Sequence, residues 1–370
     1  MATTAKWTEP AVERLDVAAY TVPTDRPESD GTLEWDSTTI VIVELTAGGE
    51  RGLGYTYADA ATAQLIDRRL RKVVEGAEAM AVGSIRDAMI AAVRNVGRPG
   101  IAAAAVSAVD AALWDLKARL LDLPLDRLLG AVREAVPVYG SGGFTSYPLD
   151  ELREQLEGWV AAGIARVKMK VGRKPEEDLA RVRAAREAIG PEPELFVDAN
   201  GAYDRKQALA FAEAFALERV SWFEEPVSSD DLEGLRLLRD RAPAGLEISA
   251  GEYGYDPWYF RRMLEAGAVD VLQADATRCL GITGFLRAAA LAEAHHIPLS
   301  AHTAPALHVH PCCALGVVRH LEWFHDHVRI ERLLFEGAPE PSSGELAADL
   351  SRPGLGLELR RDDAERYAVQ

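Results

Sequence analysis

The sequence predicts an α/β fold, a TIM (β/α) barrel that follows an α+β N-terminal region. Short apolar runs rich in β-branched and aromatic residues recur eight times after residue 131, and most gaps between them have the period of an amphipathic helix. Three successive runs end on acids at nearly equal intervals, namely Asp198, Glu224 and Glu252. A strand, a crossover helix and two loops require about that interval, so the strands are predicted to be parallel, with their carboxyl ends at one rim.

Length and charge narrow the class of protein. The chain has 370 residues, enough for a large barrel or two domains, and a formal charge of −17 from 41 basic and 58 acidic side chains. That balance argues against nucleic acid or an anionic membrane surface as a partner. The most apolar long run, 100–121, is interrupted by charges, which excludes a membrane span. Three cysteines and charged residues throughout the first twenty positions predict a cytoplasmic protein without a disulfide framework or signal peptide.

The region 1–130 is predicted to be an α+β domain. Strand patterns lie at 12–22, 38–45 and 53–57. Helical periodicity follows at 60–74, 84–96 and 102–121. The polar segment Thr24–Trp35 contains Pro and Gly and is predicted to be a loop, and a loop of that length inside a compact domain is more often functional than idle.

The region 131–335 is predicted to be the barrel. Its eight strand candidates are 136–139, 166–171, 195–197, 220–223, 246–249, 269–272, 297–300 and 320–323. Helices predicted between them include 175–189, 205–217 and 283–295. The remaining segment 336–370 is rich in Pro and Gly, has a strand-like stretch from Gly354, and is predicted to return to the N-terminal domain.

Asp198, Glu224 and Glu252 are candidate metal ligands. Strand ends converge on one face of a barrel, so three successive strands would bring these carboxylates together. Oxygen ligands without Cys or His favour Mg²⁺ over zinc. Each acid alone also has a structural interpretation, since DANG can be a turn with an Asp cap and EEP an acidic strand end. Their matched spacing on adjacent strands favours the metal site.

Lys168 and Lys170 are candidate bases. They are two residues apart in a predicted strand, so both side chains point into the barrel. Two ammonium groups buried side by side repel each other, which predicts lowered pKa values and a base that works near neutral pH. A solvent-facing pair on an edge strand is the alternative, but the apolar neighbours in VKMKV argue against it.

His302 and Asp275 are a candidate acid–base pair. His302 ends a predicted strand in PLSAHT and Asp275 ends the preceding one in VLQADA, so the carboxylate can fix the imidazole tautomer and raise its basicity. A lone strand histidine is more often a packed residue, and the catalytic interpretation depends on sharing a rim with the acids. Glu322, in the eighth strand, is a candidate proton donor. No role is predicted for four further histidines, His308, His310, His325 and His327.

Together these motifs resemble the mandelate racemase / muconate lactonizing enzyme family of the enolase superfamily, in its acid-sugar dehydratase-like part. The resemblance rests on KMK, DAN, WFEEP, AGE, QADATRCLGITG and AHT, with AAVSAVDAALWDLKARL in the N-terminal region, and it covers nearly the whole chain. It implies a modified TIM barrel, an N-terminal capping domain completed by the C-terminal tail, Mg²⁺ as cofactor and a homo-oligomer.

The resemblance also implies a role for each candidate. Mg²⁺ would be held by the three acids named above. Lys170 would be one base, with Lys168 beside it on the substrate carboxylate. His302, supported by Asp275, would be the base on the opposite face.

Two further residues and two segments acquire roles by the same resemblance. Glu322 would bind or protonate the developing oxyanion, and Asn200 would lie near the metal or substrate. Thr24–Trp35 matches a mobile capping loop, and Gly54–Tyr57 lies near a second one. AGEYGY departs from the pattern of many relatives after its Glu, which leaves local specificity contacts open.

The implied chemistry is Mg²⁺-dependent removal of the proton α to a carboxylate through an enediolate intermediate. The hypothesis is dehydration of a small sugar acid, and the alternative is racemisation or epimerisation of a 2-hydroxy acid or related carboxylate. A metal-dependent hydrolase would bring histidine ligands from the first strand, and VPVYGSGG contains none. A non-catalytic metal-binding barrel would require neither the lysines nor the His–Asp pair.

Overall fold

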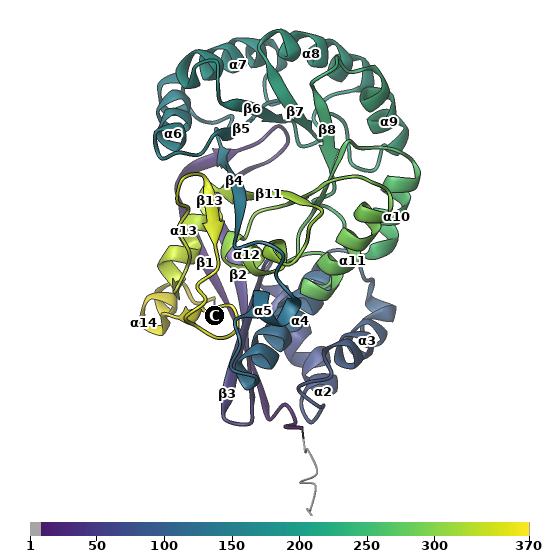
Figure 1. Cartoon of the computed structure of the whole chain (residues 1–370), viewed down its shortest axis with the longest axis vertical. Coiled ribbons are helices and arrows are strands. Elements are labelled where there is room, and N and C mark those ends of the chain that lie inside the picture. The colour runs from purple at the N-terminus through teal and green to yellow at the C-terminus, as the bar shows by residue number, and fades with distance from the viewer. Residues whose placement is uncertain (1–8, 370) are drawn as a thin grey trace, which may run out of the picture.

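The computed structural model describes residues 9–369 and consists of a barrel of eight parallel strands that carries a smaller α+β cap (Figure 1). The antiparallel sheet of the cap joins its strands in chain order, β1 (Arg14–Ser29), β2 (Glu34–Ala47) and β3 (Glu50–Tyr57). Alternate residues of β2 enter different cores, because successive side chains of a strand point to opposite faces. Val41 and Val43 pack among the cap helices, whereas Ile40 and Ile42 belong to the core shared with the barrel.

The segment 24–35, predicted to be a loop, is mostly strand. β1 and β2 continue through it as a twisted ribbon, with a register shift between Pro23 and Glu28 and a short turn over 30–33. The loop prediction was wrong because the bulge near a proline interrupts the alternation that marks a strand. The Asp30 side chain stabilises the turn, since its Oδ1 accepts the N–H groups of Thr32 at 2.6 Å and Leu33 at 2.7 Å. Residues 24–37 are called the ribbon below.

The ribbon lies against the barrel (Figure 1). Gly31 at its tip packs so closely that a Cβ there would lie 2.3 Å from the carbonyl oxygen of Ala199 and 2.7 Å from that of Val171. These carbonyls follow the ends of two barrel strands. The N–H of Thr145 donates to the Ser29 carbonyl at 2.8 Å, which adds a main-chain tie. A glycine at the tip is therefore a requirement for the ribbon to reach the barrel mouth.

The cap helices follow the sheet. They are α1 (Ala61–Leu65), the π-helical η1 (Ile66–Leu70), α2 (Arg71–Val74), α3 (Val82–Ala92), the 3₁₀ turn η2 (Arg94–Val96), α4 (Ile101–Leu120) and α5 (Leu125–Leu129). The sequence did not predict α5, which is short and follows Pro124. Helix α4 packs closely on β3. A Cβ at Gly52 would lie 2.4 Å from the carbonyl oxygen of Ala112, and a Cβ at Gly54 would lie 2.3 Å from that of Ala108. Glycines in the strand and alanines in the helix thus allow the close approach.

All eight predicted barrel strands are present. They are β4 (Ala135–Gly142), β5 (Arg166–Lys170), β6 (Glu194–Asp198), β7 (Val220–Glu224), β8 (Glu247–Ala250), β9 (Val271–Ala274), β10 (Leu299–Ala301) and β11 (Val318–Phe324). Neighbours pair in this order, and β11 closes on β4.

One helix follows each strand. These helices are α6 (Leu149–Ala161), α7 (Pro175–Ile189), α8 (Arg205–Leu217), α9 (Leu232–Arg241), α10 (Pro257–Glu265), α11 (Gly281–Ala294), α12 (Pro305–Cys313) and α13 (His325–Leu334). A TIM barrel with an N-terminal cap is therefore confirmed. Over residues 9–369, every helix is too short or too polar to span a bilayer.

Two polar side chains of α4 fix the cap on the barrel. Asp110 accepts the N–H of Thr283 at 2.9 Å and its hydroxyl at 2.7 Å, and Ser107 Oγ accepts the N–H groups of Leu280 and Gly281. The first N–H groups of a helix have no acceptor within the helix, and here side chains of α4 are the acceptors for those of α11. The cap thereby contacts the barrel just beyond the end of β9.

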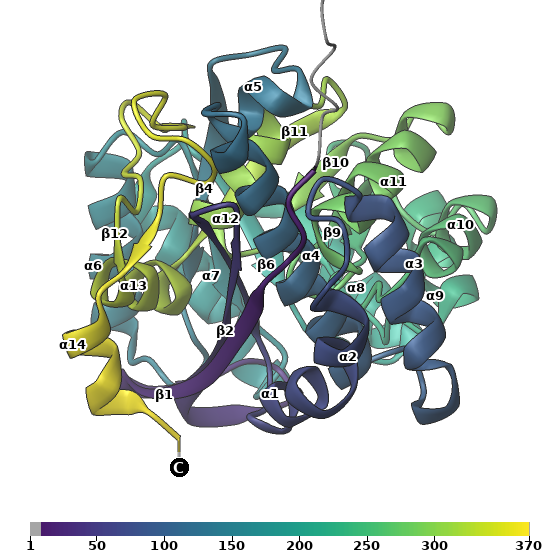
Figure 2. The ribbon, with the colours of Figure 1, turned by 90° about the horizontal axis from the view of Figure 1, so that it is seen from below.

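The tail touches both parts of the molecule. It contains β12 (Phe335–Glu336), β13 (Glu345–Ala347), β14 (Glu358–Leu359), α14 (Arg361–Ala364) and the 3₁₀ turn η3 (Glu365–Tyr367). β13 adds to the start of β4 in the antiparallel sense, and β14 pairs with β12. The strand-like stretch from Gly354 is thus a two-residue strand only. Leu355 N–H donates to Asp115 in α4, and Tyr20 in β1 bridges to Ala368. The tail with α14 lies beside β1 in Figure 2.

Candidate active site

Three buried acids meet at the carboxyl ends of successive barrel strands. Asp198 ends β6, Glu224 ends β7 and Glu252 lies two residues after β8. One oxygen of each lies within 4.8 Å of one oxygen of the other two, and all three side chains are buried. Parallel neighbours in register deliver these side chains to one rim, as the sequence pattern predicts.

The acids crowd one another. Burial and the neighbouring Asp198 raise the pKa of Glu224 to about 8, although Lys168 acts in the opposite direction. A divalent cation would relieve this crowding, and three carboxylates are the donor set that hard cations such as Mg²⁺ bind. The residues therefore fit a magnesium ion.

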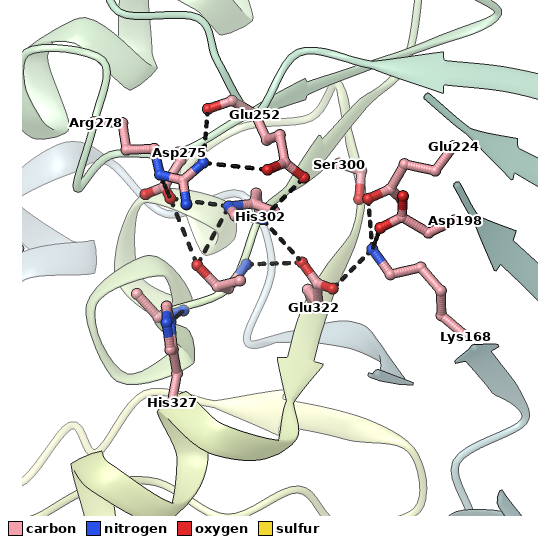
Figure 3. Close-up of polar contacts among 12 residues, drawn as sticks. Lys168, Asp198, Glu224, Glu252, Asp275, Arg278, Ser300, His302, Glu322 and His327 are labelled. Carbon is pink, nitrogen blue, oxygen red and sulfur yellow. Dashed lines mark hydrogen bonds and ion pairs between the residues drawn. The ribbon is translucent and has the colours of Figure 1, made fainter. Parts of the chain in front are cut away.

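Both lysines of β5 point at this triad. Lys168 Nζ lies 2.6 Å from Glu224 Oε1, 2.8 Å from Glu322 Oε1 and 3.5 Å from Asp198 Oδ2 (Figure 3). Lys170 Nζ donates to Asp198 Oδ2 at 2.5 Å. The two side chains share a face of the strand, as predicted from their spacing.

The predicted lowering of the lysine pKa values was wrong for this arrangement. Burial does lower the pKa of each lysine, but the carboxylates from other strands outweigh it and raise both pKa values above their usual range. Glu224 dominates for Lys168 and Asp198 for Lys170. Lys170 can consequently accept a proton only when another group binds Asp198, because the carboxylate then no longer raises the pKa of the lysine.

His302 and Asp275 form the expected pair. His302 Nδ1 lies 2.9 Å from Asp275 Oδ2, and its Nε2 lies 3.4 Å from Glu252 Oε2. Asp275 also accepts the N–H of Thr277 at 2.7 Å, which fixes its orientation. Burial opposes the charge on the imidazole, but Glu252 and Asp275 outweigh it and raise the pKa of His302 to about 9. In this arrangement the imidazole carries a proton on both ring nitrogens.

Glu322 accepts hydrogen bonds with both carboxylate oxygens in this arrangement, and its role as a proton donor stays a prediction. Its Oε1 accepts from Lys168 Nζ, and its Oε2 accepts the N–H of Thr303 at 3.1 Å. Burial raises its pKa, but the nearby cations Lys168, His302 and Lys170 together outweigh that effect and lower the pKa to about 2. Glu322 thus links Lys168 to the His302 side of the site, where its Oε2 lies 3.9 Å from His302 Nε2 (Figure 3).

A cavity of about 430 Å³ connects these groups to the cap. Lys170, His302, Glu252 and Glu322 line its floor, and residues of the turn over 30–33, of β2 and of β3 line its upper part. Asn200 also lines it, and its buried Oδ1 has no hydrogen-bond partner among the described residues. A buried amide oxygen without a partner is costly, so this position suits contact with a bound molecule. A larger cleft of about 1050 Å³ on the cap helices contains no acid–base cluster.

The sequence predicted no individual role for three residues of the site, Arg278, His327 and Tyr57. Arg278 lies 3.3 Å from Glu252 Oε1 and 3.6 Å from Asp275 Oδ2, and only its position three residues after Asp275 could have suggested it. His327, to which the sequence assigned no role, stacks on Tyr57 with 3.4 Å between ring centroids. Both rings line the cavity. Their contact joins α13 to the end of β3, and a sequence pattern does not report such distant pairs.

Glu225 is a further buried acid beside the triad. Its side chain is 1% exposed, and its Oε1 has no hydrogen-bond partner among residues 9–369. Burial, followed by the charge of Glu252, raises its pKa well above the usual range. Glu225 thus adds a second buried carboxyl with a raised pKa beside Glu224, and it is not a member of the triad.

Comparisons with known proteins agree with this architecture. The model described as "Enolase C-terminal domain-like" matches residues 151–364, and that of the "Mandelate racemase / muconate lactonizing enzyme, N-terminal domain" matches residues 15–130. The chain is 34% identical over 97% of its length to a 3,6-anhydro-alpha-L-galactonate cycloisomerase of Streptomyces coelicolor, of which the match covers 99%.

Solved structures are similar over the same length. A mandelate racemase/muconate lactonizing enzyme-like protein from Rubrobacter xylanophilus superposes with a TM-score of 0.95 at 60% identity, over 97% of this chain and all of that one. An L-talarate/galactarate dehydratase from Salmonella typhimurium, liganded with Mg and L-lyxarohydroxamate, gives a TM-score of 0.90 at 30% identity, over 100% of this chain and 96% of that one.

Proposed function

The chain belongs to the mandelate racemase / muconate lactonizing enzyme family, and from that premise we propose that it is a Mg²⁺-dependent dehydratase of sugar acids. One observation carries the proposal: two proton-transfer groups flank one acid triad. Lys170 comes from the strand before the triad strands, and the His302–Asp275 pair from the two strands after them. Such a pair can remove a proton α to a carboxylate and give one to a leaving hydroxyl, which is dehydration.

The triad and Lys168 would bind the reacting end of the substrate. Asp198, Glu224 and Glu252 would hold the cation, and bound Mg²⁺ supplies the positive charge that stabilises a carboxylate as negative charge accumulates on it. Lys168 would donate to the same carboxylate. Glu224 and Glu322 hold its ammonium in place before the substrate arrives, and such preorganised donors are most effective in a pocket that excludes water.

Lys170 is proposed as the base. Its ammonium is held by Asp198 at 2.5 Å, so engagement of that carboxylate as a ligand removes the partner that raises the pKa of the lysine. Lys168 lies on the same face of β5 and lowers the pKa of Lys170, so its repulsion then favours the neutral amine. Neutral Lys170 can accept the proton from the carbon next to the carboxylate.

His302 is proposed as the acid. The electron pair of the broken C–H bond forms a C=C bond to the β-carbon, whose C–O bond breaks, and the departing oxygen takes the proton of His302 Nε2 and leaves as water. Asp275 holds Nδ1 throughout and stabilises the charged imidazole before the transfer. The enol product rearranges to a 2-keto acid, and exchange of protons with solvent resets both groups.

Two other outcomes use the same groups. One relative described above is a cycloisomerase of an anhydro sugar acid, and its substrate contains an ether in place of a free hydroxyl. If the β-oxygen belongs to such a ring, the same elimination opens the ring and no water is lost. If the β-carbon carries no leaving group, His302 can only return a proton to the α-carbon, which gives racemisation or epimerisation.

The test is a panel of sugar acids incubated with the protein and Mg²⁺ and assayed for 2-keto acids, with product mass recorded. Loss of one water supports dehydration, and a product of unchanged mass that contains a keto group indicates cycloisomerisation. Lys170→Ala and His302→Ala should each abolish product formation. Lys174→Ala is the matched control, because Lys174 is an exposed lysine of the same segment. Exchange of the α-proton for deuterium in D₂O without any keto acid would refute dehydration and favour the racemase.

A further inference from the structure

The upper part of the active-site cavity is acidic. Asp30 from the turn of the ribbon and Asp59 from the segment after β3 both line it. The Asp30 Oδ1 is fixed by the N–H groups of its own turn, and Asp59 Oδ1 accepts the N–H of Ala61 at 2.7 Å. Both side chains are therefore held at defined positions and not free to swing away from the cavity.

The cations of the cavity are already engaged. Lys170 and His302 stand at the floor with the triad, and Arg278 is paired with Glu252 and Asp275. Among the described residues that line the cavity, the cap strands and the ribbon contribute no lysine or arginine. Burial lowers the pKa of His327 well below its usual range, so this ring is neutral at pH 7.

The remaining groups of the upper part are suited to hydroxyls. Ser37, Thr38 and Thr39 of β2 and Tyr57 of β3 line it, together with the two aspartates. A carboxylate accepts O–H hydrogen bonds well, and a hydroxyl or phenol can both donate and accept. A chain of sugar hydroxyls finds partners here, whereas a second carboxylate would meet two negative side chains and no free cation.

We propose that the cap selects polyhydroxy acids with a single carboxylate and excludes those with a carboxylate at both ends. This inference rests on the proposed function, because the reacting carboxylate is assigned to the triad end. The selection arises from repulsion at the far end of the substrate, since like charges brought together without compensation are strongly disfavoured. Galactonate and galactarate, which differ in the group at the far carbon, represent the two classes.

The experiment compares matched monoacids and diacids of five and six carbons, by kcat/KM for 2-keto acid formation with Mg²⁺. The monoacid of each reactive pair should exceed its diacid by about 100-fold. A diacid that equals or exceeds its monoacid overturns the inference and leaves the dehydratase proposal intact. If no acid is turned over, dehydration fails, and the selection is then read from the Kd of the same pairs for the Mg²⁺-loaded protein.

Variants of the two aspartates test whether they cause the preference for monoacids. The double variant Asp30→Asn/Asp59→Asn keeps both Oδ1 acceptors and removes both charges, so it should reduce the monoacid preference at least about tenfold. Asp36→Asn removes one charge from the same ribbon outside the cavity lining, and should leave the preference unchanged. An unchanged preference in the double variant overturns the inference.

Discussion

Gly31→Ala tests whether the ribbon must touch the barrel for catalysis. The added Cβ would lie 2.3 Å from the Ala199 carbonyl oxygen, 2.7 Å from that of Val171 and 3.0 Å from Ala202 Cβ. Two of these neighbours are main chain at the ends of barrel strands and cannot swing aside. The ribbon tip must therefore retreat by roughly 0.7–1 Å, and overpacking of this kind typically costs about 1–3 kcal/mol of stability.

The retreat moves part of the cavity wall. Asp30 and Leu33, on either side of the tip, line the active site, so substrate contacts above the triad loosen while the triad stays in place. A misplacement of about 1 Å can reduce catalysis about 100-fold. We expect kcat/KM for the substrate found in the acid panel to fall between about 10-fold and 100-fold, mainly through KM.

The assay is steady-state kinetics of Gly31→Ala together with its urea unfolding curve. Gly83→Ala is the control, since that cap glycine lies in α3 with no atom within 4 Å of an added Cβ. The control should keep wild-type kinetics. If Gly31→Ala retains kcat/KM within twofold of wild type, the ribbon does not need this contact and the argument is refuted.

Three further predictions concern metal, pH and stability. Mg²⁺ at about 100 times its Kd should raise the free energy of unfolding by about 2.7 kcal/mol, and Asp198→Asn should remove most of that increment in thermal or urea unfolding. Burial raises the pKa of Glu28 to about 9. The protonated carboxyl therefore stabilises the fold at low pH, and this contribution is lost as the pH rises from the ordinary pKa towards 9. The free energy of unfolding should fall by up to about 1.4 kcal/mol per pH unit over that range. Glu28→Gln should consequently flatten the fall in stability between pH 5 and pH 8, and an unchanged slope would contradict the assignment. Asp115→Ala should cost about 3 kcal/mol in urea unfolding and Asp115→Asn less, because the buried Asp115 accepts from Leu53 N–H at 2.7 Å and Leu355 N–H at 2.5 Å.

The barrel and its acid triad could be predicted from sequence because their signals are local. Each strand is a short apolar run with a helix after it. Asp198 and Glu224 end their strands, and Glu252 lies two residues after its strand. Once the strands are parallel, geometry places the three acids on one rim. The same reasoning placed Lys168 and Lys170 on one face of β5, which the structure confirms.

What the sequence could not predict depends on contacts between distant segments. The two strands of the ribbon pair across a bulge, which interrupts the alternation of inward and outward side chains by which a strand is recognised in a sequence. The protonation of Lys170 and Glu322 is governed by charges from other strands, and the stacking of Tyr57 on His327 joins residues of the cap and barrel. Side-chain spacing within one segment contains no record of these neighbours.

The position of the tail has a consequence for how the molecule is made. The cap is synthesised first, yet Asp115 receives the N–H of Leu355, Glu44 pairs with Arg361, and Tyr20 bridges to Ala368 only after the whole barrel has left the ribosome. During synthesis the cap therefore exists for a time with one face of its sheet uncovered, and that face is exposed to solvent and to chaperones. Completion of the cap is thus coupled to translation of residues 355–368, and a prematurely terminated chain would lack these contacts, even if every residue of the active site had been made.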